Sequence, residues 1–122
     1  MFERLTTAVV VSLVFTGALF ARNGKVFTDE GIASHYGKEW QGRKTASGEP
    51  LDNNALTAAH PALPFGTKVM VTLLKTGKSV VVRINDRGPF VKGRIIDLSD
   101  RAAREIGLDR YGIARVRIET IE

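Results

Sequence analysis

The chain has 122 residues, of which 43% are hydrophobic, so it is long enough for one compact domain and too short for two. It contains no cysteine, which excludes disulfide bonds, thiolate metal sites and a thiol nucleophile. Eighteen basic residues against 13 acidic ones give a net charge of +5, which favours anionic partners. Nucleic acids, cell-wall polymers and lipid head groups are all anionic, so the cellular location has to select among them.

The N-terminal segment provides that location. Residues 5–21 form an uncharged run rich in Val, Leu, Phe and Ala, with small residues near its end and polar sequence after it. The pattern favours a signal peptide over residues 1–21, and an uncleaved N-terminal anchor is the alternative. Both predict export to the periplasm or cell envelope. There we expect no nucleic acid partner, and contact with the membrane only through an uncleaved N-terminal segment.

The mature chain is predicted to be mostly β-structure. Residues 22–30 are polar and aperiodic, which predicts a linker ahead of a domain over residues 31–122. Residues 68–74 and 79–85 are β-rich runs joined by a predicted hairpin turn. Because both runs are nearly continuously apolar, we expect them to be covered on both faces. That expectation favours a closed barrel over an open sheet.

One helix and one further strand are predicted after the hairpin. The helix has Ser99 as its N-cap, an apolar stripe formed by Ala102, Ala103 and Ile106, and Gly107 at its end. Residues 114–120 alternate between apolar and charged side chains, which predicts a half-exposed strand. The expected fold class is all-β, with about six strands and one short helix.

Two loops carry more polar, Gly and Pro residues than a structural barrel needs. In the first, Glu49 lies between a glycine and a proline, which can hold an acid in a cleft or form a solvated surface turn. The second follows a buried strand and contains Asp86, Arg87 and Phe90. Its structural alternative is that Asp86 caps the turn while Arg87 pairs with a carboxylate such as Asp97.

A third segment ends in His60. A lone histidine is more often structural than catalytic, and with His35 as the second histidine a multi-histidine metal site is not expected. The sequence also has no Gly-x-Ser-x-Gly elbow of a serine hydrolase. Two loop carboxylates suit glycoside cleavage, which needs an acid for the leaving oxygen and negative charge opposite an oxocarbenium-like transition state. Glu49 and Asp86 are the candidates for these roles.

Six motifs in order along the chain resemble the rare lipoprotein A family. They are GIASHYG at 31–37, TASGE at 45–49, LTAAH at 56–60, LPFGT at 63–67, NDRGPF at 85–90 and RIIDLS at 94–99. The resemblance runs from about Gly31 to Thr120 and implies a six-stranded double-psi β-barrel, a fold shared with expansins. It also implies an endolytic lytic transglycosylase. Such an enzyme cleaves the MurNAc–GlcNAc bond of peptide-stripped peptidoglycan strands without water and leaves a 1,6-anhydro end.

The resemblance also implies roles for single residues. Glu49 would be the general acid and base, Asp86 would stabilise positive charge at the anomeric carbon or orient the C6 hydroxyl, and His60 would bond a carboxylate or a sugar. The residues expected to line the substrate groove are Tyr36, Ser47, Arg87 and Phe90. No metal and no cofactor is implied, peptidoglycan glycan strands are the expected partner, and a monomer is expected.

The chain departs from the family pattern in two ways. A lipoprotein would carry a cysteine for acylation, so lipid anchoring is not expected here. Many members add a C-terminal glycan-binding module, whereas this sequence stops at Glu122, so weaker binding to cell-wall sacculi is expected. Two alternatives to a lyase remain: an expansin-like module that binds or loosens glycan without cleaving it, and an inverting hydrolase with a water between its two acids.

Overall fold

The computed structural model describes residues 26–121, so the segment predicted as a signal peptide or anchor lies outside the described residues. The six strands are β1 (Thr28–His35), β2 (Thr57–Ala59), β3 (Lys68–Leu73), β4 (Ser79–Asp86), β5 (Arg94–Leu98) and β6 (Ala114–Ile121). One α-helix, α1 (Asp100–Ile106), and two short 3₁₀ helices, η1 (Lys38–Trp40) and η2 (Leu108–Arg110), complete the fold. Within residues 26–121, no helix has both the length and the apolar character that a membrane crossing requires.

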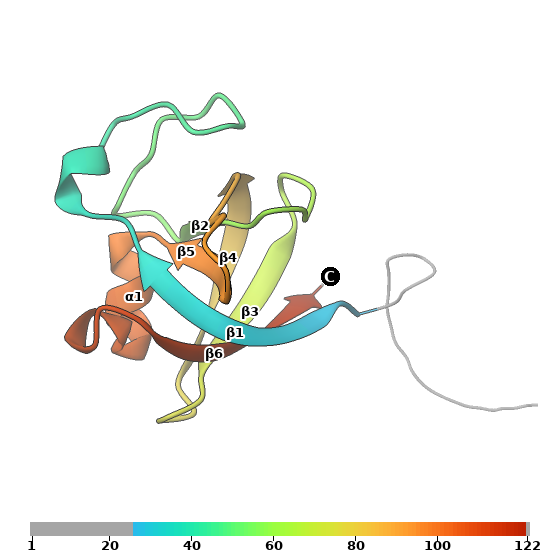
Figure 1. The fold of residues 1–122 in the computed structure, drawn as a ribbon. Helices are drawn as coiled ribbons and strands as arrows, with labels where there is room; N and C mark the ends of the chain where they lie inside the picture. The colour runs from blue at the N-terminus through green and yellow to red at the C-terminus, as the bar shows by residue number, and fades with distance from the viewer. Residues whose placement is uncertain (1–25, 122) are drawn as a thin grey trace, which may run out of the picture.

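The six strands close into a barrel in the order β1-β5-β2-β4-β3-β6 (Figure 1). Two neighbouring pairs, β1 with β5 and β2 with β4, run parallel, and the other four pairs are antiparallel. Each parallel pair contains an irregularity in its register, at Ile32/Ala33 and at Ala58/Ala59. The prediction of an all-β, six-stranded double-psi barrel with one short helix is confirmed.

The first strand begins earlier than the sequence analysis placed the domain. Thr28 already pairs with Glu119 of β6, and the Phe27 carbonyl accepts a hydrogen bond of 3.0 Å from the Thr120 N–H. The barrel therefore includes residues 28–30, which the sequence analysis assigned to the linker. These residues are polar and their side chains are exposed, so they gave no apolar pattern that would predict a strand. Strand pairing is made by backbone hydrogen bonds and does not require apolar side chains.

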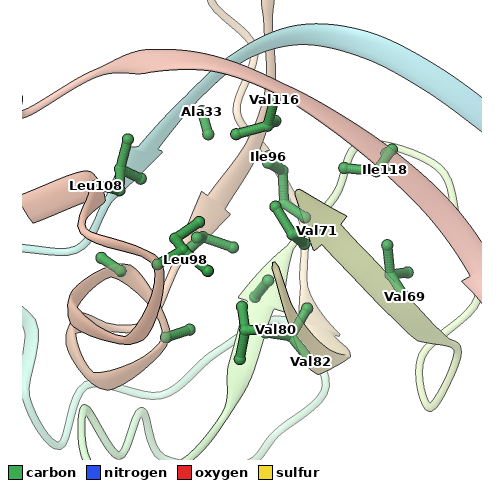
Figure 2. Close-up of a cluster of buried hydrophobic side chains, with 14 of the residues drawn as sticks. Ala33, Val69, Val71, Val80, Val82, Ile96, Leu98, Leu108, Val116 and Ile118 are labelled. Atoms are coloured by element: carbon green, nitrogen blue, oxygen red, sulfur yellow. The ribbon is translucent and has the colours of Figure 1, made fainter. Parts of the chain in front are cut away.

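The core lies inside the barrel and is built from alternating strand residues (Figure 2). Val80, Val82 and Ile84 of β4 point inward and are at most 7% exposed, whereas Val81 between them is 40% exposed. The expectation that this strand is covered on both faces is therefore wrong. A small barrel has one interior, and its outward residues meet solvent unless a loop covers them.

The helix α1 packs its apolar face against the barrel core and was predicted correctly. The Ser99 hydroxyl accepts a hydrogen bond of 3.3 Å from the Ala102 N–H, and Gly107 adopts a φ of 81° at the C-terminal cap. Ile106 and the following Leu108 are fully buried against the barrel core. Burial of such a side chain contributes roughly 1.5–3 kcal/mol.

A long connection between β1 and β2, residues 36–56, arches over the end of the barrel opposite the β3–β4 hairpin (Figure 1). The start of α1 anchors this connection. The Asp100 N–H donates to the Asn53 side chain at 2.9 Å, and the Arg101 N–H donates to the Asn53 carbonyl at 2.9 Å. The arch therefore has a fixed place above the ends of β1, β4 and β5.

Candidate active site

Asp86 is the last residue of β4, and three donors hold its carboxylate. One oxygen accepts a hydrogen bond of 2.6 Å from the Tyr36 hydroxyl. The other accepts 2.8 Å and 2.9 Å bonds from the N–H groups of Ala46 and Arg87. Together the three donors fix the direction of the carboxylate. Burial, the bond to Asp86 and the charges of Asp86 and Asp97 raise the pKa of Tyr36 far above its usual value, so its hydroxyl remains a donor.

Glu49 comes from a tight turn that docks onto the end of β4. Gly48 has a φ of 95°, a conformation that glycine adopts without strain. The N–H and hydroxyl groups of Thr45 both donate to the Glu49 carbonyl, at 2.8 Å and 2.7 Å. The Ser47 N–H donates to the Asn85 carbonyl at 3.2 Å, next to the bond from Ala46 to Asp86. The two loops that carry the predicted acids therefore meet at one end of the barrel.

The Glu49 carboxylate lies against the outer side of β4. The guanidinium group of Arg83 donates two parallel hydrogen bonds to its oxygens, of 2.9 Å and 3.0 Å, and the Asn85 side-chain amide donates a third of 3.0 Å. The Glu49 side chain is 45% exposed. The hydrogen bonds from Arg83 and then Asn85 lower the pKa of Glu49 below its usual value, so Glu49 is ionised at neutral pH.

An open cavity of about 480 Å³ lies beside Asp86. Tyr36, Asp86 and Arg87, all predicted site residues, line it, whereas Glu49, Ser47, His60 and Phe90 do not. Sequence reasoning missed the lining residues from β1, β5 and the arch: Ser34, His35, Gly37, Trp40, Arg43, Lys44, Thr45, Leu51, Arg94 and Asp97. Several of them lie inside the GIASHYG and RIIDLS motifs, which were the available signal.

Outward side chains of β1 and β5 form a polar wall of this cavity. The Ser34 hydroxyl donates to the Asp97 carboxylate and accepts a hydrogen bond of 2.6 Å from Arg94, which also forms an ion pair of 3.5 Å with Asp97. The alternative in which Arg87 pairs with Asp97 is therefore wrong. Arg87 instead stacks over the Phe65 ring at 4.2 Å and donates to the His60 carbonyl at 3.2 Å.

His60 is 6% exposed and holds a loop together. Its Nδ1 accepts hydrogen bonds from the N–H groups of Ala62 and Leu63, at 3.0 Å and 3.1 Å, and its ring meets the Phe27 ring edge to face at 5.9 Å. Burial lowers the pKa of His60, so the imidazole is neutral. Neither Glu49 nor Asp86 is among the hydrogen-bond partners of its side chain.

The two remaining predicted site residues lie at the margin. Ser47 supports the turn, where its hydroxyl bonds the Thr45 hydroxyl at 3.0 Å and accepts from the Glu49 N–H at 3.3 Å. Phe90 is 80% exposed in the β4–β5 loop and does not line this cavity. Within residues 26–121, no three His, Asp or Glu side chains are grouped closely enough to hold a metal ion.

The barrel is similar to those of several known proteins. Two solved structures of an expansin from Clavibacter michiganensis are similar to the barrel: the free protein, with 27% identity and a TM-score of 0.60, and a mutant in complex with cellohexaose, with 25% identity and a TM-score of 0.61. Each match covers 79% of this chain and 51% of the expansin chain. A Streptomyces papain inhibitor, 24% identical with a TM-score of 0.61 over 79% of this chain and 96% of its own, shares the fold.

Curated relatives are more similar in sequence. The probable endolytic peptidoglycan transglycosylase RlpA of Synechocystis is 59% identical over 75% of this chain and 29% of its own length. The endolytic peptidoglycan transglycosylases RlpA of Pasteurella multocida and Neisseria meningitidis serogroup B are 57% and 55% identical over 79% and 98% of this chain. The chain spans 33% and 51% of those two relatives. A family model described as "Lytic transglycolase" matches residues 28–118, and the chain belongs to this family.

Proposed function

We propose that this domain is an endolytic peptidoglycan lytic transglycosylase of the cell envelope. It cleaves the MurNAc–GlcNAc bond without water and leaves 1,6-anhydro-MurNAc ends, with peptide-stripped glycan as its preferred substrate. The observation that carries the proposal is the Asp86 carboxylate, held by three donors at the edge of an open cavity beside the turn that bears Glu49. The membership of the chain in the lytic transglycolase family supports it.

In the proposed reaction, a glycan strand lies along the cavity and over the turn at 45–49. Asp86 places its negative charge near the anomeric carbon as the glycosidic C1–O bond breaks and positive charge develops on the sugar. In the molecules in which Glu49 is protonated, it gives its proton to the leaving oxygen and then takes the proton of the C6 hydroxyl as that oxygen bonds to C1. The proton from the C6 hydroxyl restores the one that Glu49 gave to the leaving oxygen. The reaction therefore consumes no water.

The walls of the cavity offer the contacts that saccharides favour. Tyr36, Trp40 and the guanidinium group of Arg87 are aromatic or planar, and Ser34 and Asp97 supply polar groups along one side. In the proposed complex, Ser47 and Phe90 contact the part of the glycan that extends beyond the cavity. His60 acts by fixing the loop after β2, whose backbone N–H at His60 donates to the Asp86 carbonyl at 3.2 Å.

The second candidate is a non-catalytic module that binds or loosens glycan. The similarity of the barrel to expansin structures, one of them in complex with cellohexaose, favours it. A binding module and an enzyme make different demands on the two acids. Binding needs the shape of the cavity, whereas bond cleavage also needs a proton that can be exchanged at Glu49 and a charge at Asp86.

Conservative substitutions separate these candidates. Glu49→Gln and Asp86→Asn keep the shape of each side chain and remove its charge, so both variants should fold and bind sacculi within a few-fold of the wild type. We expect each to lose glycan cleavage by about 100-fold or more. Release of soluble fragments and co-sedimentation with peptide-stripped sacculi measure the two quantities. If both variants release fragments at the wild-type rate, the proposed catalytic roles are wrong.

A further inference from the structure

Among residues 26–121, one charged side chain, that of Arg83, hydrogen-bonds the Glu49 carboxylate. Arg83 comes from the outward face of β4, where its two terminal nitrogens meet the two carboxylate oxygens in a fork-to-fork arrangement, at 2.9 Å and 3.0 Å. Such a pair fixes the plane and the direction of a carboxylate, which a single point charge does not do. Glu49 lies on a glycine-containing turn and its side chain is partly exposed. Without Arg83, the direction of its carboxylate would therefore be free to vary.

The remaining contacts of Glu49 are uncharged. Asn85, two residues further along the same face of β4, donates one hydrogen bond of 3.0 Å to the carboxylate. Within its own turn, the Glu49 backbone is bonded by Thr45 and Ser47. Among the described residues, Arg83 is therefore the charged group that hydrogen-bonds the Glu49 carboxylate.

We propose that Arg83 is the positioning residue of Glu49: it fixes the direction of the carboxylate and sets the pH at which Glu49 takes up a proton. The inference rests on the proposed function, in which Glu49 donates a proton to the leaving oxygen. An acid stabilised in its ionised form is protonated in a smaller fraction of molecules at neutral pH, so turnover falls on the alkaline side at a lower pH than it would without the arginine.

Two substitutions of Arg83 separate charge from direction. Arg83→Met removes both, so the alkaline limb of the pH–rate profile should move to higher pH and the maximal turnover should fall by about tenfold or more. Arg83→Lys keeps a positive charge and loses the fork of hydrogen bonds that chiefly lowers the pKa of Glu49, so the limb should move part of the way to higher pH while the maximal turnover falls. KM should change less than kcat in both variants, because the strand and the cavity are unaltered.

Arg117 provides a matched control. It is also an outward strand arginine, its side chain is 42% exposed like that of Arg83, and it pairs with Glu30 and Glu119 away from the cavity. Arg117→Met should leave both the pH–rate profile and the maximal turnover unchanged. A general effect of losing a surface ion pair would appear in both variants and would show up as a fall in unfolding free energy.

The decisive experiment combines kinetics with a direct titration of Glu49. Carboxyl-carbon NMR of the full chain should give a higher pKa for Glu49 in Arg83→Met than in the wild type, and Arg83→Met should reduce turnover no further in a Glu49→Gln background. An unchanged Glu49 pKa, or an equal loss from Arg83→Met in both backgrounds, would overturn the positioning role. Full activity of Glu49→Gln would instead contradict the proposed function, and the NMR titration would still decide whether Arg83 governs the proton affinity of Glu49.

Discussion

His60 illustrates how one side chain can support a site through the loop that it holds. Sequence reasoning by resemblance made it a partner of a carboxylate or a sugar, whereas its Nδ1 accepts from the N–H groups of Ala62 and Leu63. A neutral imidazole is needed for that role, because a protonated Nδ1 has no lone pair to offer. The pairing could not be read from the sequence, since a histidine before a proline fits a catalytic loop as well as a structural one.

The stability of the domain should therefore depend on pH through His60. Its pKa in the folded state is lowered from the unfolded value of 6.5, so the unfolded state binds the proton more readily. The stabilising contribution is fully present above the unfolded pKa and is lost as the pH falls through the folded pKa. His60→Asn keeps an acceptor for the two N–H groups and removes the titration. The free energy of unfolding of His60→Asn should therefore fall less than that of the wild type when the pH is lowered from about 7.5 to about 5.

Urea unfolding of both proteins at the two pH values measures this difference, and acids such as Glu49 cancel in the comparison. His60→Ala removes the acceptor altogether and should cost about 1–3 kcal/mol at either pH. Equal loss of stability in the wild type and His60→Asn would show that His60 does not titrate in this range.

At the scale of elements, the sequence predicted the helix and strands that are marked by a local residue pattern. It missed the contacts that join residues distant in the sequence. The β3–β4 hairpin, the helix α1 with its caps and the alternating strand β6 were all visible in patterns of a few residues. The docking of the turn at 45–49 onto β4 was not, because the bond from Ala46 to Asp86 joins residues 40 positions apart. The polar side chains of Ser34 and Asp97 likewise meet through strand pairing between β1 and β5.

The start of α1 links the helix to the arch over the cavity, which gives a prediction for Ser99. Its buried hydroxyl accepts from the Ala102 N–H and donates to the Ala55 carbonyl at 2.6 Å, so it joins the helix cap to the end of the arch. Ser99→Ala should lower the free energy of unfolding by about 1–2 kcal/mol. Ser79→Ala, at the exposed start of β4, is the control and should stay within about 0.5 kcal/mol of the wild type. Urea unfolding that fails to distinguish the two variants would contradict this linkage.

At the scale of the whole molecule, the closed barrel explains why two acids far apart in the sequence come to one end. Asp86 ends a strand, and Glu49 lies in an arch that the helix and the same strand hold in place. Motif order allowed the fold and the two acids to be predicted together. The side of β4 on which each acid lies was not predictable, because it depends on hydrogen-bond partners that are distant in the sequence. Asp86 faces the cavity with Tyr36, and Glu49 faces Arg83.

The central claim is that this end of the barrel cleaves glycan strands without water. Mass spectrometry of purified peptide-stripped glycan after incubation with the protein tests it most directly. We expect fragments that end in 1,6-anhydro-MurNAc, which are lighter by one water than hydrolysis products, and we expect the Asp86→Asn variant to yield about 100-fold less of them. New reducing ends would show a hydrolase, and glycan that is bound but carries no new ends would show a binding module; either result would contradict the account.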